Sequence, residues 1–195
     1  MKNKLFILAG QSASGKTTIE KLLYDKITQQ GLPIKRLISN TTRKARKGEQ
    51  QGVDYNFSTL HDFDLSYKNN EIAEYNSFRI DSVKENWIYF TKKSDIDLMN
   101  SSMLAIKEPI GISQLRQQYK DEIVVFYITC PDEIRKERYI SRGATVDDVD
   151  SRFTRDYDTF KHFKYNYEIV NDGSHSLKGC ASLILSLMKG EMGIE

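Results

Sequence analysis

The residues of this chain with the clearest chemical purpose form one loop, Gly10-Gln11-Ser12-Ala13-Ser14-Gly15-Lys16-Thr17. Its glycines let backbone N–H groups turn toward phosphate oxygens, the Lys16 ammonium can reach the bridge between the β and γ phosphates, and the Thr17 hydroxyl can bind Mg²⁺. An apolar run at 5–9 precedes the loop, and apolar residues at helical spacing follow it. The loop therefore predicts a nucleoside triphosphate site.

A second group of residues suits the phosphate of a smaller nucleotide. Arg43 and Arg46 offer planar guanidinium groups and Tyr55 offers a phenol, a donor set that suits a dianionic phosphate. A solvated basic loop is the alternative interpretation.

Alternating strand and helix patterns must position these groups. Apolar runs predict strands at 5–9, 34–39, 102–106, 123–128 and 167–170. Helical spacing follows the phosphate loop and returns near 112–119, after Pro131, at 151–163 and in the tail at 177–188. We therefore expect an α/β fold with a mostly parallel five-stranded sheet, flanked by helices and binding ligands at the carboxyl ends of its strands.

The segment 40–93 departs from this alternation, because it is polar, aromatic and irregular. We expect it to form an inserted lobe with a small, partly β core, while 1–39 and 94–195 form the core of a single domain. The acidic run 147–150 reads as a turn that interrupts the helices. Arg135 and Lys136 read as part of a solvated helix face.

Composition narrows the class of protein. No apolar stretch approaches the roughly 20 residues that span a bilayer, and the first apolar run is too short for a signal peptide. Cys130 and Cys180 lack metal-ligand spacing, so we expect core thiols and a cytoplasmic location. A net charge of +2 gives no support for nucleic-acid binding. We expect small-molecule nucleotides as partners, no membrane, and a monomer or a homodimer.

Taken in order, several motifs resemble those of the guanylate kinase family over residues 4–188. The run Ser39-Asn40-Thr41-Thr42-Arg43-Lys44-Ala45-Arg46-Lys47-Gly48-Glu49 is similar to that family's S-x-[ST]-T-R-x-x-R-x-G-E, and 52–57 to its G-x-D-Y-x-F. Segment 70–75 looks like its G-E-F-x-E-[YW], 138–143 like its R-L-x-x-R-G lid, and 170–172 like its V-x-N-D near the adenine site. The resemblance implies a P-loop kinase fold, ATP and Mg²⁺, and phosphorylation of GMP or dGMP.

The resemblance also implies roles for individual residues. Catalysis would use Lys16 of the phosphate loop together with Arg138 and Arg142 of a lid region at 138–155. Arg152, with Arg155 one turn later, would contribute from the following helix, and Thr17 would bind the metal. The ATP site would comprise Gly10, Ser12, Ala13, Ser14, Gly15, Lys16, Thr17, Thr18 and Asn171. The acceptor site would comprise Ser39, Arg43, Arg46, Glu49, Tyr55, Glu74, Tyr89, Thr91 and Glu108. Within it, the Glu74 carboxylate would accept from the N1–H and the exocyclic amine of guanine, a donor pair that adenine does not present on that edge. An ordinary surface glutamate is the alternative interpretation of Glu74.

Two segments differ from the family pattern. The family's L-D-I-D-x-x-G reads here as Leu104-Ala105-Ile106-Lys107-Glu108-Pro109-Ile110-Gly111, so Ala105 and Lys107 replace two acids and only Glu108, one position late, can substitute. Its N-x-Y-G-T reads as 86–91, where Trp87 and Phe90 are bulkier and suit either the core or packing on a different base or sugar.

These differences keep other functions open. One alternative is a kinase of the same fold that acts on another nucleotide or on a phosphorylated sugar. A second is a non-catalytic guanylate-kinase-like module that binds phosphorylated peptides. Lys16 and Thr17 argue against the module, because a peptide binder needs no triphosphate cradle.

Overall fold

The computed structural model describes residues 2–80, 85–174 and 176–194. Its strands are β1 (Leu5–Ala9), β2 (Ile34–Arg36), β3 (Asn40–Thr41), β4 (Asn56–Phe57), β5 (Ile72–Ile80), β6 (Glu85–Lys92), β7 (Ser102–Ile106), β8 (Ile123–Thr129) and β9 (Tyr167–Val170). Its α-helices are α1 (Lys16–Gln29), α2 (Leu60–Lys68), α3 (Pro109–Tyr119), α4 (Asp132–Ile140), α5 (Val146–Phe160) and α6 (Leu177–Met192).

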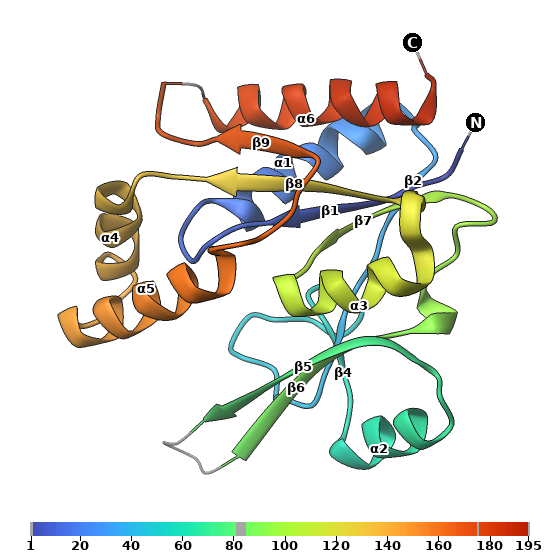
Figure 1. Cartoon of the computed structure of the whole chain (residues 1–195), viewed down its shortest axis with the longest axis horizontal. Helices are drawn as coiled ribbons and strands as arrows, with labels where there is room; N and C mark the ends of the chain where they lie inside the picture. Colours follow the sequence, from blue (N-terminus) through green and yellow to red (C-terminus); the bar gives the residue numbers. More distant parts are fainter. Residues whose placement is uncertain (1, 81–84, 175, 195) are drawn as a thin grey trace.

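A parallel sheet of five strands lies at the centre of the molecule, in the order β2-β7-β1-β8-β9 (Figure 1). The predicted five-stranded α/β architecture is confirmed. All five residues of β1 are buried, as expected of a strand that is covered on both faces and paired on both sides. The phosphate loop therefore begins at the middle of the edge formed by the carboxyl ends of the strands.

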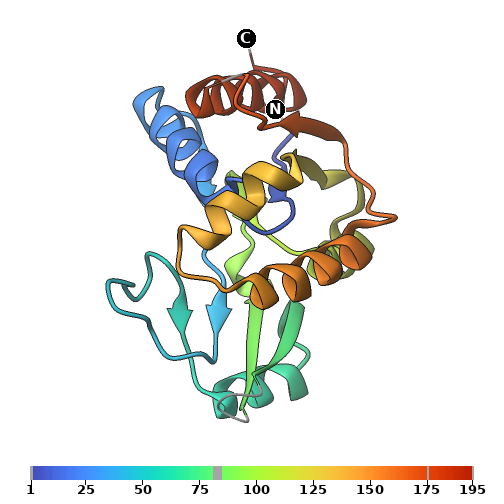
Figure 2. The same cartoon turned by 90° about the vertical axis from the view of Figure 1, so that its left-hand side faces the viewer.

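Helices cover both faces of this sheet (Figure 1). On one face α1 and α6 pack through a cluster that includes Phe6, Ile19 and Ile184. On the other face α3 packs through a cluster that includes Ile7 and Leu115. Helices α4 and α5 lie at the end to which the strands point, and they face the viewer in Figure 2. They are thus close to the phosphate loop.

A second sheet is built entirely from residues between 40 and 92, in the order β4-β3-β6-β5. Its main part is the antiparallel pair β5 and β6. Helix α2 packs Phe63 against Ile88 and Phe90, which gives this sheet a small core of its own. Phe90 is fully buried there, so its bulk serves packing.

Helix α5 begins earlier than expected. The Thr145 hydroxyl accepts from the Asp148 backbone N–H, and the Asp148 carboxylate accepts from the Thr145 backbone N–H. The reading of 147–150 as an interrupting turn is therefore wrong, because the acidic residues form the first turn of α5, where carboxylates interact favourably with the helix dipole.

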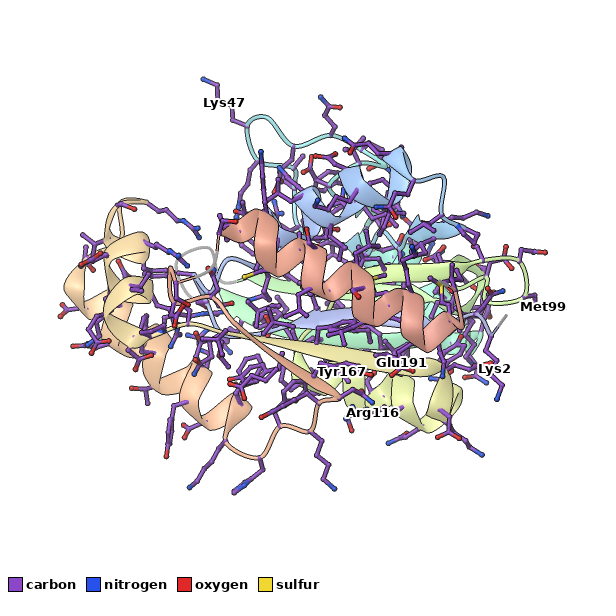
Figure 3. The ribbon with its side chains drawn as sticks, turned by 90° about the horizontal axis from the view of Figure 1, so that it is seen from above. Lys2, Lys47, Met99, Arg116, Tyr167 and Glu191 are labelled. Atoms are coloured by element: carbon purple, nitrogen blue, oxygen red, sulfur yellow. The ribbon has the colours of Figure 1, made fainter. Side chains whose placement is uncertain are left out.

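The C-terminal elements are joined by a side-chain contact at the far end from α4. The Tyr167 hydroxyl donates to Glu191 Oε1 at 2.6 Å and so links β9 to α6, as Figure 3 shows from above. In the same view Lys47 extends outward from the loop between β3 and β4. None of the helices in the described part of the chain is long and apolar enough to cross a membrane.

Candidate active site

The phosphate loop connects β1 to α1. Gly15 caps α1 with a φ of +98°, and a Cβ at this position would lie 2.5 Å from the Asn171 Nδ2 atom, so only glycine fits. The Lys16 ammonium folds back over the loop and donates to the carbonyl oxygens of Gly10 at 2.5 Å and Gln11 at 2.9 Å. The lysine thus lies across the mouth of the loop.

Burial changes the acid–base properties of the two charged groups beside the loop. It lowers the pKa of Lys16 from 10.5 to about 8, while the nearby Glu108 carboxylate opposes that shift. Burial also raises the pKa of Glu108, and Lys16 opposes that shift in turn. Glu108 therefore lies near Lys16, although it follows the strand one position later than the family's acids.

The loop has the donors that a phosphate needs. The first N–H groups of an α-helix have no partner within the helix, and in the described structure no side chain caps α1. The buried Ser14 hydroxyl also has no hydrogen-bond partner among the described residues. The side chains of Thr17 and Thr18 are exposed at the start of α1. These features fit a phosphate chain with a divalent cation.

Side chains from the C-terminal half hold the loop in place. The Asp156 carboxylate accepts from the Ser12 backbone N–H at 2.6 Å, and Arg135 Nε donates to the Ser12 carbonyl at 2.9 Å. Asn171 Nδ2 donates to the Ser14 carbonyl at 2.8 Å, and Asn171 is itself buried. The buried Asn171 side chain thus holds the Ser14 carbonyl of the phosphate loop in place.

The interpretation of Arg135 as part of a solvated face is wrong. Arg135 is 1% exposed, and its Nη2 atom donates to Asp156 at 2.7 Å. Its guanidinium also lies 4.0 Å from the centre of the Phe153 ring. The residue therefore anchors α4 and α5 to the phosphate loop.

The remaining arginines proposed for catalysis lie at different distances from the loop. Arg138 Nη1 donates to the Ala13 carbonyl at 3.3 Å. Arg152 Nε donates to the Ser12 hydroxyl, and Arg152 also lines the large cavity described next. Arg142 is exposed beyond the end of α4. The structure thus places two of the three against the loop.

A cavity of about 380 Å³ lies between the two sheets, next to the phosphate loop. Seven of the predicted site residues line it: Ser39, Arg46, Tyr55, Glu74, Tyr89, Glu108 and Arg152. Trp87 lines it as well, so this bulky residue faces the cavity while Phe90 faces the core. The cavity has the size of a small-ligand pocket.

Arg43 and Glu49 lie behind the cavity wall. Two nitrogens of the Arg43 guanidinium donate to the Glu49 carboxylate at 2.8 and 2.9 Å, and Arg43 Nε donates to the Tyr89 hydroxyl at 3.0 Å. The hydrogen bonds from Arg43 lower the pKa of Glu49 to about 2. This bidentate pair orients Tyr89, which does line the cavity.

A buried ion pair forms another part of the wall. The Lys107 ammonium donates to Glu74 Oε1 at 2.6 Å, to Ser39 Oγ at 2.8 Å and to the Thr91 hydroxyl. The Thr91 hydroxyl in turn donates to Glu74 Oε1 at 2.6 Å. Thr91 is fully buried, so its hydroxyl contacts the Glu74 carboxylate from the interior of the protein. Ala105, in contrast, packs into the core beneath α3.

Several cavity residues were missed from the sequence. Asn76 and Phe78 line the cavity beside Glu74, and the alternation of side chains along a strand could have found them, because positions 74, 76 and 78 share one face. Arg155, which the resemblance implies one turn beyond Arg152 on α5, was not missed, and it also lines the cavity. Asp156 had no local signal, because its partners are distant in the sequence.

Among the described residues, no group of three His, Cys, Asp or Glu side chains could hold a metal ion. Such a group is not needed by Mg²⁺ at a nucleotide site, which is commonly held by one or two protein oxygens together with phosphate oxygens and water. Thr17 and Glu108 are the protein oxygens that fit this pattern.

Comparisons with known proteins agree with this geometry. The family model described as guanylate kinase matches residues 2–183. A guanylate kinase of Clostridium tetani (strain Massachusetts / E88) is 30% identical over 192 residues, which cover 96% of this chain and 88% of the relative. One from Fusobacterium nucleatum is 29% identical over 191 residues, covering 95% and 96%. The crystal structure of guanylate kinase from Anaplasma phagocytophilum shares the fold, with a TM-score of 0.65 at 22% identity, covering 97% of this chain and 86% of that one. The chain therefore belongs to the guanylate kinase family.

Proposed function

We propose that the protein transfers the γ-phosphoryl group of ATP to a guanine nucleoside monophosphate, GMP or dGMP. The observation that carries this proposal is the position of Arg152, which donates to Ser12 of the phosphate loop and also lines the acceptor cavity. A cation at this point would lie between the two phosphates that must meet. The names of the curated relatives support the same reaction.

Phosphoryl transfer needs alignment and charge neutralisation more than covalent help. Lys16 and the uncapped start of α1 would bind the triphosphate, and Arg46 with Tyr55 would bind the acceptor phosphate. Arg138 and Arg152 would stabilise the negative charge of the transferred group, and Arg142 would approach it if 138–155 closes as a lid. Closure would also exclude water, which otherwise accepts the phosphoryl group.

Thr17 and Glu108 would hold Mg²⁺ beside the triphosphate. When bound, the ion would neutralise part of the charge on the phosphates and orient them. The Thr17 hydroxyl is exposed at the start of α1, and Glu108 lies close enough to Lys16 for each to shift the pKa of the other.

The test is ADP release from Mg-ATP by the purified protein, with GMP, dGMP, AMP, CMP, UMP and dTMP offered separately. We expect release with the guanine nucleotides, and none with Lys16→Ala, which loses the ammonium at the phosphates. Tight ATP binding without transfer to any of these nucleotides would contradict the proposal. It would favour a kinase for another acceptor, such as a phosphorylated sugar. Absence of ATP binding would favour a non-catalytic module.

A further inference from the structure

The wall of the cavity that would face the base contains Lys107, at a position where the guanylate kinase motif L-D-I-D-x-x-G has an acidic residue. Lys107 is 6% exposed and Glu74 is 4% exposed, so the pair is shielded from water. The ammonium has three N–H donors, and the three partners named above use all of them: Glu74, Ser39 and Thr91. Lys107 therefore has a fixed position and a fixed set of partners.

This arrangement divides the Glu74 carboxylate into two unequal oxygens. Oε1 accepts from Lys107 and from Thr91. Oε2 faces Gly111, where an added Cβ would lie 2.5 Å from it. The hydrogen bonds that the Glu74 carboxylate accepts from the described residues both end on Oε1, and none ends on Oε2. Glu74 and Gly111 both line the cavity. Only Oε2 is thus left to accept from a ligand.

A carboxylate with two available oxygens can accept two neighbouring donors at once. Guanine offers such a pair, its N1–H and its 2-amino group, and the match distinguishes it from hypoxanthine, which keeps the N1–H but has no 2-amino group. Because Oε1 already accepts from Lys107 and Thr91, the second of the two guanine donors has no carboxylate oxygen to which it can donate. The contact that would favour guanine over hypoxanthine is therefore weakened.

Ser39 completes the donor and acceptor pattern of this wall. Its Oγ accepts from Lys107, so its own hydrogen can point elsewhere, and Ser39 lines the cavity. A hydroxyl donor beside a single carboxylate acceptor suits a ring N–H next to a carbonyl oxygen. Guanine, hypoxanthine and xanthine share this combination, whereas adenine has neither the ring N–H nor the carbonyl.

We propose that Lys107 sets the base preference of the acceptor site. By occupying Oε1 of Glu74, Lys107 leaves one carboxylate oxygen, Oε2, to accept from one ring N–H of the base. The site therefore accepts 6-oxopurine monophosphates with or without a 2-amino group. The proposal rests on the function proposed above, since it concerns the acceptor of that reaction.

The first test uses the unmodified protein with Mg-ATP and compares kcat/KM for GMP with that for IMP. We expect the two values to lie within about tenfold of each other, and AMP to be unused, because one hydrogen bond to a charged group is commonly worth tenfold or more when it is made. A preference for GMP of more than about tenfold overturns the proposal.

The second test uses Lys107→Met, which keeps a long unbranched side chain but removes the charged donor on Oε1 and leaves Thr91 as the single remaining donor there. The ratio of kcat/KM for GMP to that for IMP should rise at least about tenfold. Lys178→Met, on the exposed surface of α6, is the matched control and should leave the ratio unchanged. An unchanged ratio in folded Lys107→Met overturns the proposal. If this variant does not fold, the ratio measured for the unmodified protein decides.

Equilibrium binding measurements distinguish a failure of this proposal from a failure of the proposed reaction. Calorimetric titration of the unmodified protein with GMP and with IMP needs no phosphoryl transfer. Dissociation constants within about tenfold support the role of Lys107 even if no acceptor is phosphorylated, in which case only the proposed function fails. Tight binding of GMP with no binding of IMP overturns the role of Lys107, as does binding of neither.

Discussion

Asp156 accepts a hydrogen bond from the backbone N–H of Ser12 at 2.6 Å, although 144 positions separate the two residues. The same Oδ2 atom accepts from Arg135 at 2.7 Å, and Arg135 also donates to the Ser12 carbonyl. One buried ion pair thus holds both backbone polar groups of Ser12 in the phosphate loop.

Asp156→Ala should lower the free energy of unfolding by about 3 kcal/mol, because it leaves the buried Arg135 guanidinium with only the mostly exposed Asp132 as a counter-ion. Urea unfolding at neutral pH measures the loss. Asp158→Ala on the same helix is exposed, so this control should change stability by less than about 0.5 kcal/mol. Equal losses in both variants would show that the pair does not stabilise the fold.

The affinity for ATP should depend on pH through Lys16. Its pKa is lowered by burial to about 8, and only the ammonium form attracts phosphate, so the dissociation constant should rise about tenfold per pH unit once the pH exceeds that value. Titrations between about pH 7 and 9.5 measure this trend. Lys16→Ala should bind weakly with no such trend.

Protein stability should change in the opposite direction over the same range. The unfolded chain holds the Lys16 proton up to its ordinary pKa of 10.5, whereas the folded chain releases it from about pH 8. The unfolded state therefore binds more protons in this window, and the contribution of Lys16 to stability rises with pH there. An ATP affinity that is constant through pH 9 would exclude Lys16 as the titrating group.

Glu108→Gln should weaken the use of Mg²⁺. An amide keeps the size of the side chain but loses the charge beside Lys16, so the Mg²⁺ concentration for half-maximal ADP release should rise about 10–100-fold. A Mg²⁺ titration at saturating ATP measures it. Glu133→Gln, exposed in the first turn of α4, is the control. An unchanged Mg²⁺ requirement would leave Glu108 without a role at the metal.

Gly111→Ala should impair the acceptor site alone. The new methyl group would lie 2.5 Å from Glu74 Oε2, so the carboxylate must move or lose access to the base. The KM for the acceptor should rise about tenfold, while the KM for ATP stays unchanged.

Gly190→Ala in α6 is the matched control, because nothing lies within 4 Å of its added Cβ. It should leave both KM values unchanged and stabilise the protein by about 0.5–1 kcal/mol, since alanine loses less conformational freedom in a helix than glycine. An equal rise of the acceptor KM in both variants would mean that the effect is not local to Glu74.

Local patterns in the sequence predicted the fold well. The run 5–9 followed by the loop at 10–17 and by helical spacing specifies strand, turn and helix from neighbouring residues alone, and the structure confirms each element. The start of α5 was missed although its signal is local. The spacing of Thr145 and Asp148 is that of a helix cap, and the interpretation as a turn gave too little weight to it.

Contacts between distant segments could not be predicted in this way. Arg135 has the spacing of an exposed helix residue, and its burial follows only from the packing of α4 and α5 over the phosphate loop. Lys107 was recognised as a departure from the family pattern. Its contacts with Glu74 and Thr91, however, require β5 and β6 of the second sheet to lie beside the end of β7.

The support of Ser14 by Asn171 has a consequence for the order in which the fold forms. The phosphate loop and the side chains that hold it are far apart in the chain, because Asn171 lies 157 positions beyond Ser14 and Asp156 lies 144 positions beyond Ser12. Closing so long a stretch of chain costs entropy before the contact can form, so contacts of this kind slow folding. We therefore expect the phosphate loop to take its final shape late in folding, after its own strand and helix have formed.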